Sequence, residues 1–224
     1  MSSDRPYVLT PVLLGLTAVT GLIDAVSFLA LGQVFTANMT GNVVFLGFAA
    51  SGAPGLSVAR STAALAAFLS GAAGGGRLAL KMAAGPRHRW TGAAFGAEAG
   101  LLLLATLACL GAPGGQPAGP GRVYAVIGLT GLAMGVRNAT VRKLGVPDLT
   151  TTVLTLTLTA LAADSPLAGG QPQRSARRVG SVVAIAAGAA AGAWLLRSSL
   201  PLALAVAAAI SALCATAAYL SCHE

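Results

Sequence analysis

The sequence predicts an all-α membrane protein, because three observations agree. Of the 224 residues, 55% are hydrophobic and only 9% are charged, whereas a soluble domain carries roughly 25% charged residues. The mean hydropathy is +0.78. The apolar runs are long, unbroken and rich in Ala, Leu and Gly, which is typical of spanning helices and differs from the alternating strands of a membrane barrel. We therefore expect a polytopic helical protein surrounded by the lipid bilayer.

Eight apolar stretches divide into six long ones and two short ones. A helix needs roughly 20 residues to cross about 30 Å of hydrocarbon. The short stretches, 36–50 and 149–163, reach only about 22 Å at 1.5 Å per residue, and polar clusters lie at their beginnings, "TANMTGN" and "PDLTTT". They are predicted to be re-entrant or broken helices. The six predicted spanning helices are 8–31, 58–80, 91–111, 122–142, 179–197 and 200–220.

The two halves of the chain resemble each other when the sequence is shifted by 110 residues. The stretch 20–46 then aligns without gaps with 130–156, with seven identical residues. Both halves have the same order of a long stretch, a short stretch with a polar start, and two long stretches, which indicates an internal repeat. The predicted organisation within one membrane domain is a first repeat over 1–111, a Gly/Pro-rich connector over 112–121 and a second repeat over 122–224.

The basic residues set the expected orientation, because Lys and Arg gather on the cytoplasmic side of membrane proteins. If all eight stretches span, the count of Lys and Arg is seven inside against six outside. If the short stretches enter and leave on one side, the count is ten against three. The second arrangement is favoured. It places both termini in the cytoplasm and gives two inverted repeats of about 110 residues, as in many transporters; eight helices in parallel repeats are the alternative.

The two polar clusters are predicted to begin half-helices that enter from opposite sides and meet near the membrane midplane. A helix N-terminus carries free N–H groups and the positive end of the helix dipole, so it can hold an anion or a polar solute inside a membrane. Capping alone is the alternative, because Asn, Asp and Thr are good N-caps. The predicted substrate-binding residues are Asn38, Thr40, Gly41, Asn42, Asp148, Thr150, Thr151 and Thr152.

Three charged residues, Asp24, Glu98 and Arg137, lie away from the ends of the predicted spanning helices. Such charges cost about 2.5–3.5 kcal/mol on insertion scales and mark functional positions. In the repeat alignment Arg137 lies three residues past the position of Asp24, so we predict an Asp24–Arg137 ion pair, with Asn138 beside it. This pair is either a static clamp or a coupling and gating element. Glu98 is expected either to be proton-linked or to bond to a neighbour.

Two long stretches resemble the signatures of a known family. They are "TGLIDAVSFLALGQVFTANMTGNVVFLGFA" and "AMGVRNATVRKLGVPDLTTTVLTLTLTALAADS", and they are similar to the two signatures of the YoaK-like family of bacterial membrane proteins. The resemblance covers nearly the whole chain. It implies a location in the bacterial inner membrane and a domain of unknown function. Many members have a Gln-Asn pair in the second signature, whereas this chain has Arg137 before Asn138.

The predicted function is a small transporter or channel for a polar or anionic solute, with Asp24, Arg137, Asn138 and Glu98 as coupling or gating residues. A scaffold that transports nothing is the first alternative and a membrane-embedded enzyme the second. We expect no enzyme, because the chain has six acidic residues and two histidines without metal-ligand spacing. No metal and no cofactor are expected. The net charge of +8 is assigned to cytoplasmic loops and not to nucleic acid, and a homo-oligomer is compatible with the sequence.

Overall fold

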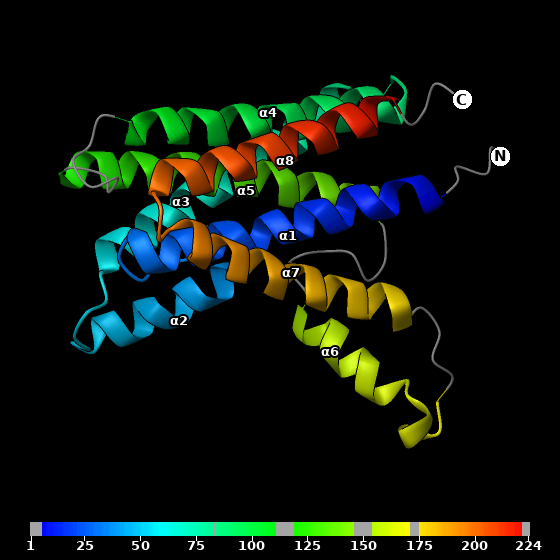
Figure 1. Cartoon of the computed structure of the whole chain (residues 1–224), viewed down its shortest axis with the longest axis horizontal. Helices are drawn as coiled ribbons and strands as arrows, with labels where there is room; N and C mark the ends of the chain where they lie inside the picture. The colour runs from blue at the N-terminus through cyan, green and yellow to red at the C-terminus, as the bar shows by residue number, and fades with distance from the viewer. Residues whose placement is uncertain (1–5, 83, 111–118, 146–153, 171–174, 221–224) are drawn as a thin grey trace.

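The computed structural model describes residues 6–82, 84–110, 119–145, 154–170 and 175–220. In these ranges the chain is helical (Figure 1). The long helices agree with the predicted spanning stretches to within four residues at each end. The elements are α1 (Pro6–Ala30), α2 (Met39–Ala50), α3 (Val58–Lys81), α4 (Arg87–Cys109), α5 (Pro120–Leu144), α6 (Leu154–Ala163), the 3-10 turn η2 (Pro166–Ala168), α7 (Ser175–Leu195) and α8 (Leu200–Leu220).

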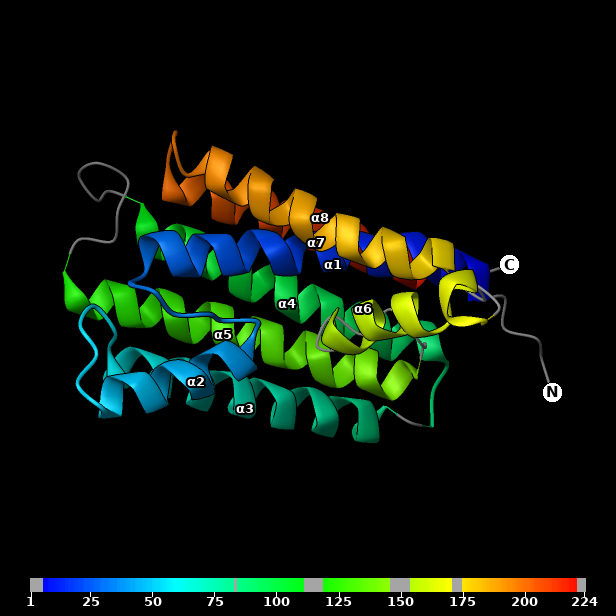
Figure 2. The ribbon, with the colours of Figure 1, turned by 90° about the horizontal axis from the view of Figure 1, so that it is seen from below.

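The six long helices lie along one common axis. Helices α1, α4 and α7 run in one direction, and α3, α5 and α8 run in the other (Figures 1 and 2). The closest pairs are α3 with α5, α4 with α8, and α1 with α7, and further contacts join α4 to α5 and α1 to α8. Helices α1, α4, α5 and α8 thus form the inner group, and α3 and α7 lie outside it.

Five of the described helices are long and apolar enough to cross a membrane, namely α1 from Thr10 onward, α3, α4, α7 and α8. Helix α5 equals them in length with 25 residues, which corresponds to about 37 Å. Its composition is more polar because it carries Arg122, Arg137, Arg142 and Lys143. Length and composition therefore identify five of the six predicted spanning helices, and α5 stands apart by its charges.

The two short helices begin near the middle of the bundle and run outward to opposite ends. Helix α2 has 12 residues and α6 has 10, so they measure only about 18 and 15 Å. After α1 the chain turns back toward the middle, and α2 returns to the end that α1 had reached (Figure 2). Helix α2 packs on α3, and α6 packs on α7. The predicted short segments are thus short helices, and α2 has the geometry of a re-entrant segment.

Glycines allow two pairs of long helices to touch along their backbones. A Cβ on Gly21 would lie 2.1 Å from the carbonyl oxygen of Ile185, and one on Gly188 would lie 1.9 Å from that of Ala18, so α1 and α7 meet directly. In the same way α3 and α5 meet because a Cβ on Gly135 would lie 2.1 Å from the carbonyl oxygen of Phe68. Such spacing of small residues is the usual basis of close helix packing in membranes.

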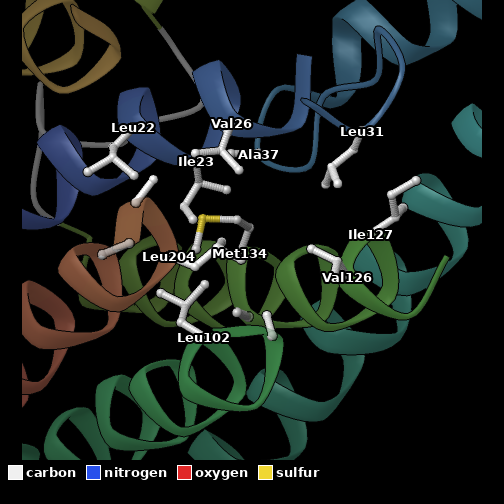
Figure 3. Close-up of a cluster of buried hydrophobic side chains, with 14 of the residues drawn as sticks. Leu22, Ile23, Val26, Leu31, Ala37, Leu102, Val126, Ile127, Met134 and Leu204 are labelled. Carbon is white, nitrogen blue, oxygen red and sulfur yellow. The ribbon is translucent and has the colours of Figure 1, made fainter. Parts of the chain in front are cut away.

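The centre of the inner group is filled by apolar side chains. Met134 of α5 points toward Ile23 of α1, with Leu204 of α8 beside it (Figure 3). These three side chains are fully buried. A second apolar cluster, which includes Leu13, Phe95 and Ala218, fills the end of the bundle where α1 begins and α8 ends. The ion pair described next is therefore set among buried apolar side chains.

Candidate functional site: two polar centres within the bundle

The first polar centre is an ion pair between Arg137 of α5 and Glu98 of α4. Both side chains have 0% exposure. The guanidinium Nε donates to Oε2 of Glu98 at 2.9 Å, and Nη2 donates to Oε1 of the same carboxylate. The contact is therefore bidentate, which is the strongest arrangement that an Arg and a carboxylate can form. Each side chain balances the charge of the other inside a helix bundle that excludes water.

Two further helices complete this centre. Nη1 of Arg137 donates to the carbonyl oxygen of Leu16 at 2.6 Å and to the hydroxyl of Thr20 at 2.7 Å, both in α1. The hydroxyl of Ser211 in α8 donates to Oε1 of Glu98 at 2.6 Å. One network thus joins α1, α4, α5 and α8. We call these five residues the ion-pair junction.

The predicted Asp24–Arg137 pair is wrong, because Arg137 pairs with Glu98. The physical reason is the packing: α5 lies along α4, and Arg137 reaches α1 at Leu16 and Thr20, one to two turns before Asp24. The repeat alignment indicated which positions are equivalent, and it could not indicate which helices are neighbours. The expectation that Glu98 bonds to a neighbour is confirmed. Sequence reasoning missed Ser211 and Thr20 because hydroxyls are common in spanning helices and carry no separate signal.

The second polar centre surrounds Asp24 and the start of α2. Oδ1 of Asp24 accepts the backbone N–H of Ala37 at 2.9 Å and that of Asn38 at 3.3 Å. The carboxylate of one helix thus satisfies amides at the N-terminus of another, where free N–H groups and the helix dipole favour negative charge. We call Asp24 together with residues 31–42 the α2 turn.

Asn42 fixes the backbone of the α2 turn. Its side chain has 0% exposure, accepts the N–H of Phe35 at 2.9 Å and donates to the carbonyl oxygen of Phe35. Gly41 is required because a Cβ there would lie 2.6 Å from the ring of Phe35. That ring stacks on Phe28 and Phe45, with centroids 5.2 and 5.6 Å away. Two of the predicted substrate-binding residues therefore shape the turn.

The other predicted residues of this cluster are placed differently. Asn38 occupies the N-cap position of α2, but its side chain makes no capping hydrogen bond, and both Asn38 and Thr40 are exposed. Side-chain capping by Asn38 is therefore wrong, and Asp24 binds the amides of Ala37 and Asn38, which precede the first helical residue. Thr36 was not predicted as a site residue, yet its hydroxyl is fully buried and has no hydrogen-bond partner within the described part of the chain. Such a group is rare in a folded protein.

The second predicted cluster precedes helix α6. Its residues, Asp148, Thr150, Thr151 and Thr152, lie outside the described residues, as does most of the predicted connector. Helix α6 begins two residues later, at Leu154, near the middle of the bundle. Asn138 donates from Nδ2 to the carbonyl oxygen of Met134 at 2.8 Å, within its own helix. Over the described ranges, no three His, Cys, Asp or Glu side chains are grouped to hold a metal ion.

The chain is similar in sequence to one described family and to one curated protein. Residues 12–217 match the family described as "Protein of unknown function (DUF1275)". The chain is 35% identical over 160 residues to "UPF0700 transmembrane protein YoaK" of Bacillus subtilis (strain 168). That alignment covers 68% of this chain and 64% of the relative, which is slightly less than two thirds of its length. No solved structure matches the chain. The resemblance to the YoaK-like family is thereby confirmed.

Proposed function

The chain belongs to the DUF1275 family, and from this premise we propose that this integral membrane protein is a small transporter or channel for a polar or anionic solute. The observation that carries the proposal is the ion-pair junction. Charged groups inside membrane helices are rare and mark solute or ion pathways. A buried ion pair adds little stability over apolar residues of similar volume. Arg137 and Glu98 therefore point to a role beyond holding helices together.

We propose six spanning helices in two inverted repeats, with α5 as the fourth span. Its charge near the midplane, Arg137, is neutralised by Glu98, so α5 can cross in spite of its lower hydropathy. The contacts support the inverted arrangement because they occur in matched sets. In the repeat alignment, α1, α2, α3 and α4 correspond to α5, α6, α7 and α8. The contacts α1–α7, α1–α8 and α2–α3 therefore correspond to α5–α3, α5–α4 and α6–α7, and all six are present. Equivalent helices of the two halves run in opposite directions.

The proposed orientation places the C-terminal ends of α3, α5 and α8 on the cytoplasmic side. Exposed basic residues gather at that end of the bundle, among them Arg77, Lys81, Arg142 and Lys143. The opposite end has Arg60, Arg122 and Arg197. This bias favours a multi-pass protein of the bacterial cytoplasmic membrane with both termini inside.

The α2 turn is the proposed contact for the solute, together with the residues that precede α6. Asp24 already occupies the N-terminus of α2, so an anionic group of the solute would have to replace its carboxylate there. The unpartnered hydroxyl of Thr36 supplies a hydrogen-bonding group for a polar solute. Asn38 and Thr40 are exposed. Movement of α1 against α5 would break the bonds from Arg137 to Leu16 and Thr20, which makes the junction the proposed gate.

Flux through reconstituted liposomes tests the proposal. Swelling would be measured after isosmotic exchange of sucrose for glycerol, alanine or sodium lactate, which represent a neutral, a zwitterionic and an anionic solute. We expect protein-dependent swelling with one class and its loss in the double variant Glu98→Gln, Arg137→Gln. Arg122→Gln, at the exposed start of α5, is the matched control and should swell normally. No swelling with any of the three, or unchanged swelling in the double variant, would overturn the proposed function.

A scaffold without transport is the second candidate. It is favoured by the completeness of the junction, in which Nε, Nη1 and Nη2 of Arg137 all have acceptors, as expected of a static clamp. A scaffold would keep the same helix contacts in every state, so a disulfide between α1 and α5 would leave its assembly unchanged. The same cross-link would stop a transporter. A homo-oligomer fits either candidate, and no enzymatic activity is proposed.

A further inference from the structure

We propose that the groove between α4 and α8 at the basic end of the bundle binds an anionic phospholipid of the surrounding membrane. The groove has a volume of about 280 Å³, and none of its lining residues belongs to the ion-pair junction. It is lined by Gly92, Ala215, Thr216, Tyr219 and Leu220. The inference is independent of transport, because it concerns the outer surface of the bundle.

The groove exists because Gly92 has no side chain. A Cβ at this position would lie 3.1 Å from Cβ and Cδ2 of Tyr219, so any larger residue would close the space. Ala215 and Tyr219 are four residues apart and therefore share one face of α8. Their apolar surfaces and the side chain of Leu220 make a lining that suits an acyl chain.

Basic side chains of α4 lie at the end of the groove that faces the basic end of the bundle. His88 and Arg89 precede Gly92 by four and three residues. They therefore lie on the same side of α4, one turn closer to its N-terminus. The ring of His88 meets that of Tyr219 edge to face, with centroids 5.6 Å apart and an interplanar angle of 78°. Arg89 is exposed. The positive end of the α4 helix dipole adds to this positive field, and Pro86 at its N-cap makes no side-chain cap.

The neighbouring helix ends make the same surface more basic. Lys81 at the end of α3, Arg87 at the start of α4, and Arg142 and Lys143 at the end of α5 are exposed there. Among the described residues, the acidic side chains are Asp24, Glu98 and Asp164, and none of them is on this part of α4 or α8. A phosphate with a negative net charge suits this end of the groove, and basic pockets between spanning helices are a known form of lipid headgroup site.

Native mass spectrometry of the purified full chain tests this site. The probes are phosphatidylglycerol and phosphatidylcholine with the same two oleoyl chains. We expect the anionic lipid to be retained more strongly. Gly92→Leu should reduce its retention roughly tenfold by filling the groove, and Arg89→Gln should reduce it roughly fivefold. The controls are Gly96→Leu, where nothing lies within 4 Å of an added Cβ, and Arg122→Gln at the opposite end.

Three results would overturn the proposal. They are equal retention of the two lipids, unchanged retention in Gly92→Leu, and complete displacement of the lipid by soluble glycerol phosphate, which would indicate an anion site without an acyl chain. If Gly92→Leu does not fold, Thr216→Trp fills the groove from its exposed rim and replaces it in the comparison. Thermal unfolding of each variant shows whether it is folded.

Discussion

The two polar centres of this protein hold their charges in opposite ways. At the ion-pair junction two side chains of opposite charge neutralise each other at 0% exposure. At the α2 turn one carboxylate, that of Asp24, is held by neutral backbone amides and is partly exposed. The first centre is balanced and closed. The second is partly open and contains a buried hydroxyl, that of Thr36, which has no hydrogen-bond partner among the described residues. The difference indicates that the polar groups of the junction are more completely bonded than those of the α2 turn.

The largest expected effect comes from removing one partner of the closed centre. Glu98→Ala leaves the guanidinium of Arg137 buried without a counter-charge, which should lower the free energy of unfolding by about 3–5 kcal/mol. Thermal unfolding in detergent micelles measures the change. The double variant Glu98→Leu, Arg137→Leu should recover most of the loss. A Glu98→Ala protein as stable as the wild type would mean that Arg137 is not held in dry surroundings.

A smaller effect is expected at the open centre. Asp24→Ala removes two hydrogen bonds to a charged acceptor and should cost about 1.5–3 kcal/mol. Hydrogen exchange of the amides of Ala37 and Asn38 should rise, while exchange in α5 stays unchanged. Asp164→Ala is the control, because its half-exposed pair with Arg178 contributes about 0–1 kcal/mol. If the two amides exchange in Asp24→Ala as slowly as in the wild type, the carboxylate does not hold the turn.

Asn42→Ala sharpens the comparison within the α2 turn. The substitution leaves the N–H and C=O of Phe35 without partners and should cost about 1–3 kcal/mol. Unfolding in denaturant and the fluorescence of a reporter on α2 would follow the change. Thr40→Ala, on the exposed side of the same helix, should stay within about 0.5 kcal/mol of the wild type. If both variants lose the same stability, the cluster acts as a general cap and Asn42 has no special place in it.

The smallest effect on stability is expected at Thr36. Thr36→Val keeps the shape and removes a buried hydroxyl that has no partner, so stability should stay equal or rise by up to about 1 kcal/mol. Any solute flux should fall, because the hydroxyl is a proposed solute contact. A clear loss of stability would reveal an internal partner for the hydroxyl, and unchanged flux would remove Thr36 from the proposed site.

The sequence predicted the helices because their signal is local. Apolar length placed the long helices, and the shortness of α2 together with its polar start predicted a segment that turns back. The partner of Arg137 could not be predicted, because pairing depends on which helices are neighbours. The shift by 110 residues directed attention to Asp24 on α1, whereas α5 lies against α4. Likewise, Asn38 occupies the predicted N-cap position but its side chain makes no capping bond, and nothing in the sequence indicated that Asp24 of α1 would bind the amides of Ala37 and Asn38.

The glycine contacts between α1 and α7 and between α3 and α5 have a consequence for how the protein is made. Each half of the chain gives its second long helix to the other half. When the ribosome has finished α4, helix α3 is already in the membrane but its partner α5 has not been synthesised, and α1 still lacks α7. The first half must therefore wait for the second, because Gly21 of α1 packs on the backbone of Ile185 in α7 and Gly71 of α3 packs on that of Leu132 in α5. We expect two separately expressed halves to be stable only when they are produced together.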